Sequence, residues 1–426
     1  MNILYLAHRI PYPPNKGDKL RAFRQLQRLS ERHKVWCACF VDGPEEYQYL
    51  TPLRGYCQEV AAVELRPVPA KIRGLWNLLR GGTVTEAFYR HREMSQLVQR
   101  WSRSVGFDAV VAFSSSMAPY ALSVPTRRRV LDLCDCDSRK WLDYAEISRL
   151  PARWLYRVEG KRLARKERGW LQAFDATILI TRAEAAMLLG GADHKKLHIV
   201  GNGVRISRVH CDRLMTHPTI GFVGVMDYRP NVDAVCWFVR ECWGAIRDAH
   251  GDVEFRIVGR SPTRAVRKLA KVPGVTVVGG VDDVAWELDR FDVSIAPMRI
   301  ARGLQNKVLE AMACGIPVVL TSEAAEGIDG RNGRDYIVTE SVEAMIRNVR
   351  RLLRDEEERK RVGAAGRSFV EKNHRWDDVL DKFEIIVTGI VDRSAPATDV
   401  MTRPRASSYD PAVLGEQDAA LSPGGA

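Results

Sequence analysis

The sequence lacks both a long apolar run and an ordered set of cysteines. Its most apolar segments, such as Thr177–Ile180 and Pro317–Leu320, end well short of the roughly 18 to 20 residues that a membrane-spanning helix needs. The nine cysteines are scattered and include no C-x2-C pair. We therefore expect neither a transmembrane helix nor a zinc module or disulfide framework, and reduced thiols in the cytoplasm are the default.

The N-terminus also lacks the features of a secretory signal, because its apolar run is short and no small-residue cleavage site follows it. With 46% hydrophobic and 28% charged residues, the composition is that of a globular protein, which excludes wholesale disorder and a fibrous protein. A chain of 426 residues is expected to form two or three domains.

Charge is distributed unevenly along the chain. Residues 1–205 carry 34 Lys or Arg against 20 Asp or Glu, whereas the remainder carries 31 against 33. A basic N-terminal half favours an anionic partner, which leaves a membrane surface, a nucleic acid and a phosphorylated substrate as alternatives. No recognised nucleic-acid-binding module is present, so we expect no nucleic-acid partner.

Short aliphatic runs alternate with longer amphipathic segments, which is typical of parallel strands joined by crossover helices. The pattern resets near residues 203–218, where we place a linker. It predicts two α/β domains in series, at residues 1–205 and 206–392. A final helix over residues 376–391 is a candidate to pack back on the first domain, and residues 393–426 are rich in small residues and are expected to be disordered.

The most informative segment is Ala296–Leu320. It predicts the end of a strand, a loop containing Gly303, a helix over residues 304–314 and a cap at Gly315. A helix N-terminus after a glycine loop presents unpaired backbone N–H groups, which suit a diphosphate. Arg299, Arg302 and Lys307 add cations there, and Glu310 is placed to accept hydrogen bonds from ribose hydroxyls. Taken alone, Lys307 and Glu310 would also fit a solvated ion pair on one helix face.

The string GLQNKVLEAMACGIPVV, which starts at Gly303, resembles the nucleotide-sugar region of GT-B glycosyltransferases, in particular the retaining enzymes of family 4, also called group 1. The resemblance implies two Rossmann-like parallel-sheet domains that face a cleft. It also implies that Glu310 grips the donor ribose, while Lys307 and the Gly303–Leu304 turn hold the diphosphate. Many family members carry a second Glu eight positions before this one, where the chain has Arg302.

Other segments match the same family in order and spacing. The string IGFVG ends at Gly224 and resembles the first strand and phosphate loop of the donor domain, with Arg229 nearby. A PYPPNKGD string in the first domain resembles a glycine loop that reaches across the cleft. The further residues implied to line the donor site or the cleft are Arg260, Asp282, Asp283, Gly17 and Asp18.

The string LDLCDCDSRKW, together with the opening PYPPNKGDKLR, resembles a subgroup of exopolysaccharide sugar transferases associated with exosortase (PEP-CTERM) loci. It contains Asp135 and Asp137 at a strand end, where they either orient the acceptor or cap the next helix. We expect no metal at this D-x-D, because GT-B enzymes offset diphosphate charge with cations and helix dipoles.

The resemblance implies a hexosyltransferase that moves a sugar from a nucleotide diphosphate sugar to a saccharide or lipid-linked hydroxyl, with retention of configuration, in exopolysaccharide biosynthesis. Asp135, Asp137 and Arg302 are the candidate catalytic residues, and no cofactor is expected. The alternative is a nucleotide-sugar epimerase of the same fold. A dehydrogenase is disfavoured, since no G-x-G-x-x-G turn follows the first strand.

A basic amphipathic pattern over Arg153–Arg168 has two interpretations. It fits a helix that lies on an anionic membrane, and it equally fits an ordinary solvated helix with a core-facing stripe. Trp76, Leu78 and Leu79 provide a second candidate contact. The expected location is the cytoplasm, with a possible peripheral position on the inner face of the cytoplasmic membrane.

Overall fold

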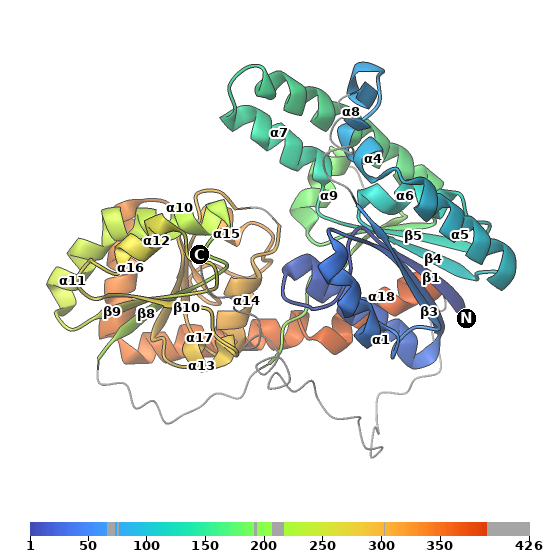
Figure 1. The fold of residues 1–426 in the computed structure, drawn as a ribbon. Coiled ribbons are helices and arrows are strands. Elements are labelled where there is room, and N and C mark those ends of the chain that lie inside the picture. The colour runs from blue at the N-terminus through green and yellow to red at the C-terminus, as the bar shows by residue number, and fades with distance from the viewer. Residues whose placement is uncertain (66–72, 75, 191–193, 207–216, 302, 390–426) are drawn as a thin grey trace, which may run out of the picture.

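The computed structural model describes most of the chain as two α/β domains that lie side by side (Figure 1). The described residues are 1–65, 73–74, 76–190, 194–206, 217–301 and 303–389. Three sequence predictions lie wholly or largely outside them, namely the linker near residues 203–218, the disordered tail and the role of Arg302.

The first domain is built on a seven-stranded parallel sheet of order β3-β2-β1-β4-β5-β6-β7. Its strands are β1 (Asn2–Ala7), β2 (Lys34–Val41), β3 (Glu59–Glu64), β4 (Ala109–Phe113), β5 (Arg128–Cys134), β6 (Ala176–Leu179) and β7 (Leu197–Ile199). The helices that join them are α1 (Gly17–Arg32), η1 (Pro44–Tyr49), α2 (Leu50–Leu53), α4 (Val84–Tyr89), α5 (Arg92–Val105), η2 (Ser115–Met117), α6 (Ala118–Leu122), α7 (Asp137–Ile147), α8 (Ala152–Ala173) and α9 (Arg182–Leu189).

The second domain holds a six-stranded parallel sheet of order β10-β9-β8-β11-β12-β13. Its strands are β8 (Thr219–Val223), β9 (Glu254–Val258), β10 (Val275–Gly279), β11 (Val293–Ala296), β12 (Val318–Thr321) and β13 (Ile337–Thr339). The helices are α10 (Arg229–Phe238), the π-helical turn η3 (Val239–Trp243), α11 (Gly244–His250), α12 (Arg264–Leu269), α13 (Val284–Leu288), α14 (Asn306–Ala313), α15 (Ser322–Ala325), α16 (Val342–Arg354), α17 (Glu356–Asn373) and α18 (Trp376–Thr388).

The observed strands confirm the α/β fold expected from the alternation of aliphatic runs. β11, for example, spans Val293–Ala296 as the sequence pattern predicts, and all of its residues are buried. Runs buried on both faces are expected of a parallel sheet that helices cover on both sides. Both faces of the first sheet carry a buried apolar cluster, and the second domain has one large cluster of its own.

The last helix, α18, packs on the first domain although it follows the second domain in the chain (Figure 1). Val379, Phe383 and Val387 join the apolar cluster that contains β1 and β4 residues. Burying each such side chain contributes about 1.5 to 3 kcal/mol. The chain therefore crosses between the domains twice, once near residue 204 and once near His374, where Val204 N–H donates to the His374 carbonyl at 2.8 Å.

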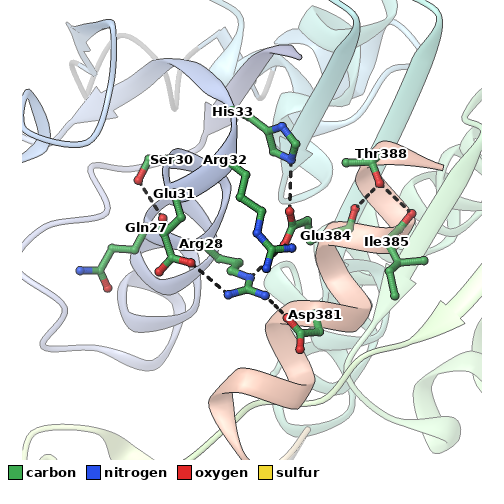
Figure 2. A network of polar contacts seen from close by, with 10 residues as sticks. All are labelled: Gln27, Arg28, Ser30, Glu31, Arg32, His33, Asp381, Glu384, Ile385 and Thr388. Atoms are coloured by element: carbon green, nitrogen blue, oxygen red, sulfur yellow. Dashed lines mark hydrogen bonds and ion pairs between the residues drawn. The ribbon is translucent and has the colours of Figure 1, made fainter. Parts of the chain in front are cut away.

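Polar contacts attach α18 to α1 as well (Figure 2). Arg28 Nε donates to Glu384 Oε2 at 2.9 Å and forms an ion pair with Asp381. The His33 ring Nε2 lies 3.2 Å from the other oxygen of Glu384. Because Glu384 is only 7% exposed, this network fixes the second crossing against the first domain.

Candidate functional site

The topology places the candidate residues at the carboxyl edges of the two sheets. In each parallel sheet the strand order reverses at one point, between β1 and β4 in the first domain and between β8 and β11 in the second. Ligands of open α/β sheets bind outside the carboxyl ends of the strands at such a point. The loops after β8 and β11 are therefore the expected donor-side loops.

Lys307 joins these two loops. It lies in the first turn of α14, which follows β11, and its Nζ donates to Asn231 Oδ1 at 2.7 Å on α10, which follows β8. The ammonium also lies 5.2 Å from the centre of the Phe222 ring. Burial lowers the pKa of Lys307 to about 8, and the Glu310 charge opposes that shift. Within the described chain, Lys307 forms no ion pair, so no carboxylate in direct contact neutralises this cation.

Glu310 lies one turn further along α14 and is partly buried. Burial raises the pKa of its carboxyl to about 7, and the Lys307 charge acts against the shift. Among the described residues its carboxylate has no hydrogen-bond partner. A partly buried acceptor of this kind suits a ligand that brings hydroxyl donors.

The other predicted cations differ in what holds them. Arg299 forms an ion pair with Asp233 of α10 and is about half exposed, so its charge is already matched by the protein. Arg229 starts α10 and is exposed, with no ion pair in the described chain. Among these described candidate cations, Lys307 is therefore the one that is partly buried and forms no ion pair.

Several predicted residues meet where the two domains touch. A β-carbon on Gly17, at the start of α1, would lie 3.4 Å from Asn306 Nδ2 at the start of α14. Arg260 Nη2 donates to the Asn15 carbonyl at 2.9 Å, which joins the glycine loop to the end of β9. Asn202 Nδ2 donates to Asn306 Oδ1 at 3.0 Å. The start of the donor helix thus faces the first domain directly.

The remaining residues predicted for the donor side contact other parts of the second domain or lie on its surface. Gly224 follows β8, and a β-carbon there would lie 2.6 Å from Asn231 Nδ2, so the glycine lets Asn231 approach Lys307. Asp283 caps α13 by accepting from Ala285 N–H at 2.9 Å. Asp282 is exposed beside it. Leu304 packs against the apolar core of the second domain.

In the first domain, Asp18 follows Gly17 in the first turn of α1. Its carboxylate lies 3.2 Å from Arg9 Nη1 and 3.6 Å from the His8 ring. Burial opposes the charge, but the hydrogen bond with His8 and the charge of Arg9 hold the pKa of Asp18 well below its usual range. The Asp18 carboxylate therefore already has two partners, His8 and Arg9, in the loop after β1.

Asp135 and Asp137 occupy different settings. Asp137 begins α7 and accepts a hydrogen bond from Ser115 Oγ at 2.5 Å. Asp135 is exposed at the domain junction, and a β-carbon on Gly303 would lie 2.7 Å from its Oδ1. Gly303 has a φ of 58°, which a glycine adopts without strain. The structure therefore brings Asp135, and not Asp137, against the donor loop.

Two buried residues near this junction were missed by the sequence analysis. Glu184 hydrogen-bonds with Asp135, and its Thr181-x-x-Glu184 spacing is a capping-box signal that could have drawn attention to it. Arg21 donates to Asp132 Oδ2 at 3.0 Å and to the Asn202 side chain at 3.0 Å. No local sequence signal marks Arg21, because its partners are far away in the chain.

The described residues show no group of three or more His, Cys, Asp or Glu side chains that is arranged to hold a metal. No helix in the described ranges has the length and hydrophobicity needed to cross a membrane. A cavity of about 670 Å³ lies at the crossings between the domains, lined by residues such as Arg182, Gly201 and His374. It shares no lining residue with the candidate donor site.

Residues 217–355 match the family model described as glycosyl transferases group 1. A phosphatidyl-myo-inositol mannosyltransferase of Propionibacterium freudenreichii is 27% identical over 196 residues, which cover 40% of this chain and 49% of the relative. A GDP-mannose-dependent alpha-(1-6)-phosphatidylinositol monomannoside mannosyltransferase of Mycobacterium tuberculosis is 31% identical over 148 residues, or 31% of this chain and 38% of the relative. The chain thus spans half or less of these curated relatives.

Solved structures match nearly the whole fold. HepE of Anabaena, in complex with UDP, has a TM-score of 0.64 at 13% identity, covering 92% of this chain and 100% of its own. Sucrose-phosphate synthase of Thermosynechococcus elongatus has a TM-score of 0.66 at 13% identity, covering 90% and 98%. The chain therefore has the GT-B fold of these structures, and residues 217–355 of its second domain match the group 1 glycosyl transferase model.

Proposed function

We propose that the protein transfers a hexosyl unit from a nucleotide diphosphate sugar to an acceptor hydroxyl. The observation that carries the proposal is Lys307, a partly buried cation with no ion-pair partner among the described residues, at the N-terminal turn of α14. Burying an unpaired charge is costly unless a ligand supplies the counter-charge. A diphosphate at the helix N-terminus supplies it, since the free N–H groups there also attract anions.

The chemistry follows from the charges that develop during transfer. Departure of the nucleoside diphosphate places negative charge on the leaving oxygen, and preorganised cations and dipoles stabilise that charge. Lys307 and the start of α14 take this role, and Glu310 accepts hydrogen bonds from the ribose hydroxyls. On the opposite side of the junction, Asp135 is positioned to orient the acceptor hydroxyl.

The substrates are proposed from the relatives and from the family resemblance. The curated relatives are named as mannosyltransferases that act on phosphatidylinositol lipids, which supports a hexose donor and a lipid-linked acceptor. The UDP in the HepE complex leaves the uridine nucleotides as candidates beside the guanosine nucleotides. Retention of configuration and a place in exopolysaccharide assembly rest on the family resemblance. No observation favours the epimerase.

A lipid-linked acceptor requires a surface that reaches the membrane, and we assign this role to the α7–α8 hairpin (Figure 1). Leu150 and Trp154, at its tip, are 76% and 56% exposed. Arg162 of α8 donates to the Leu78 and Gly82 carbonyls and so attaches a segment whose Trp76 and Leu79 are also exposed. The exposed cations along the hairpin are Lys140, Arg149, Arg153, Arg157, Lys161, Arg165 and Arg168.

Vesicle co-sedimentation tests the surface. Binding should be stronger to phosphatidylglycerol vesicles than to neutral phosphatidylcholine vesicles and should weaken with salt, because anionic lipids attract the cations. The double variant Leu150→Ala, Trp154→Ala should lose binding, while Ile385→Ala, at an exposed apolar residue of α18, should retain it. Equal binding by both variants would remove the membrane assignment.

Nucleotide release tests the function. The protein is incubated with UDP- and GDP-hexoses and a bacterial lipid extract, and nucleoside diphosphate and glycolipid are both measured. We expect release and glycolipid from one donor, and strong loss of both in Lys307→Ala. Conversion of donor to an isomeric nucleotide sugar without acceptor would instead identify an epimerase, and inactivity with every donor would contradict the proposal.

A further inference from the structure

We propose that Glu184 is a positioning residue that donates a carboxylic-acid hydrogen bond to Asp135 and so holds Asp135 in place to orient the acceptor hydroxyl. This inference rests on the proposed glycosyl transfer and adds a residue to it. Sequence motifs and the family resemblance single out Asp135 but not Glu184.

The backbone around Glu184 would suggest a purely local role. Thr181 caps α9 by accepting from the Glu184 N–H at 3.2 Å, and the T-x-x-E spacing is that of a capping box. In that motif the Glu side chain returns to the N–H of the capping residue. Here the carboxyl turns to the loop after β5 instead, where Cys136 N–H donates to Glu184 Oε1 at 3.4 Å.

The second oxygen of Glu184 is available for a hydrogen bond to Asp135. Oε2 is buried and accepts no hydrogen bond from the described residues, so it is free to carry a proton. The Glu184 and Asp135 carboxyls hydrogen-bond to each other, and two carboxylates in contact cannot share a hydrogen bond unless one is protonated. Glu184 is only 8% exposed, and its pKa is raised to about 9 whereas that of Asp135 is raised to about 6, so the proton belongs on Glu184 and the charge on Asp135.

The surrounding charges are consistent with this assignment. Burial and the Asp135 charge raise the pKa of Glu184, and burial together with Asp137 raises the pKa of Asp135. The positive charges of Arg21 and Lys140 lower the pKa of Asp135 and so offset part of this rise. The titratable or charged groups that face the pair or its loop are Arg21 from α1, Cys134 and Cys136 from the loop, Asp137 and Lys140 from α7, Glu167 from α8 and Tyr228 before α10.

The arrangement gives Asp135 a fixed orientation toward the donor side. The charged carboxylate faces Gly303 of the donor loop, and the neutral acid of Glu184 supports it from behind. Deprotonation of Glu184 at high pH would place two carboxylates against each other and displace Asp135. The rate of transfer should therefore decline at alkaline pH because Glu184, in the first domain, loses its proton.

Glu184→Gln tests the inference, because an amide N–H can replace the acid O–H as donor to Asp135 but does not titrate. At neutral pH we expect Glu184→Gln to have near wild-type kcat. At alkaline pH, the decline in kcat that results from displacement of Asp135 should disappear in this variant. Glu184→Ala should lower kcat/KM for the acceptor by about tenfold or more, since small misplacements of reacting groups are costly. Neither variant should change nucleotide affinity.

Glu159→Gln is the matched control. Glu159 is also buried in the first domain, but it accepts from Val84 and Thr85 N–H on α4, away from Gly303, so its substitution should leave the pH profile unchanged. Because loss of the Lys307 charge weakens donor binding in the same pH range, kcat is compared at saturating donor. If Glu184→Gln keeps the wild-type alkaline decline in kcat under that condition, or Glu184→Ala keeps wild-type acceptor kinetics, the inference is wrong. A wild type that binds no nucleotide and transfers no sugar would instead contradict the proposed function itself.

Discussion

The two domains treat charge in opposite ways. The first domain buries Lys19, Arg21, Asp132, Glu159, Glu167 and Glu184. Among the described residues after the first domain, the buried charged residues are Asp335 and, on α18 where it packs against the first domain, Glu384. Each buried charge needs specific partners, because burial without them costs several kcal/mol. The second domain instead has one large apolar cluster beneath its sheet edge.

The difference shows what holds the candidate site residues in place in each of the two domains. On the donor side, packing of β8, β11 and α14 places a few polar groups at a helix start. On the acceptor side, a network of buried charges sets the position of the loops. The group 1 family match covers residues 217–355 alone, so the part built by packing is also the part that the family shares.

Arg21→Met should give the largest effect on stability. The guanidinium is 2% exposed and bonds to Asp132 and to the Val200 and Gly201 carbonyls, so its loss leaves the buried Asp132 carboxylate without its ion-pair partner Arg21. We expect the first domain to lose about 3 to 5 kcal/mol of stability. Urea unfolding measures the loss of stability, and hydrogen exchange of the amides in each sheet shows which domain loses it.

The control is Arg256→Met in the second domain, where the Arg256 pair with Glu287 is partly exposed to solvent. This substitution should destabilise less and should affect the six-stranded sheet alone. Equal losses in the two domains would break the contrast between a charge-built and a packing-built domain.

Lys307→Ala should give the next largest effect, on donor binding. A hydrogen bond to a charged group contributes about 1.5 to 3 kcal/mol, so nucleotide affinity should fall by about 10- to 100-fold. Arg299→Ala serves as comparison, because Asp233 already pairs with that arginine. Isothermal titration with nucleotide measures the loss of affinity in both variants. A greater loss of affinity in Arg299→Ala than in Lys307→Ala would mean that Arg299, and not Lys307, is the main phosphate cation.

Donor affinity should also depend on pH. Lys307, with a pKa lowered to about 8, is charged below that pH and loses its charge above it. Glu310, with a pKa raised to about 7, becomes a full acceptor only above that pH. Affinity should thus peak between these values and fall by up to about tenfold per pH unit on the alkaline side. Lys307→Arg should abolish the alkaline fall, and a flat wild-type profile would contradict the account.

Arg28→Ala should have the smallest effect. Its side chain joins α1 to Glu384 and Asp381 of α18 at a partly exposed position, so we expect a loss of about 1 kcal/mol. Hydrogen exchange should show faster opening of α18 with little change in the second sheet. Arg240→Ala, at an exposed pair with Glu241, should change neither region, and an equal effect of both would mean that the network does not hold α18.

The sequence was sufficient to predict the fold, because fully buried parallel strands appear as short aliphatic runs. The placement of Gly303, Lys307 and Glu310 at one loop and helix start was also predictable, since their signal is local, while their part in donor binding stays a prediction. The helix itself begins at Asn306, two residues after its predicted start.

The acceptor side was less predictable for a physical reason. Arg21, Asp132 and Asn202 meet only after the first sheet has formed, and no local spacing records such a network. Arg299 looked like a phosphate ligand from its place in the loop, and its pairing with Asp233 of another helix was not visible in the sequence. Glu184 carried a signal, but the signal pointed to a helix cap.

The central claim is that α14 holds a nucleotide diphosphate sugar, and Glu310→Ala tests it most directly. Wild type and variant are titrated calorimetrically with UDP, GDP and their sugar conjugates, first without and then with Mg²⁺. The account predicts that one nucleotide binds the wild type, that the variant binds it about tenfold or more weakly because the ribose loses a buried acceptor, and that metal changes neither result. Equal affinity of the two proteins, or no binding of any nucleotide, would contradict it.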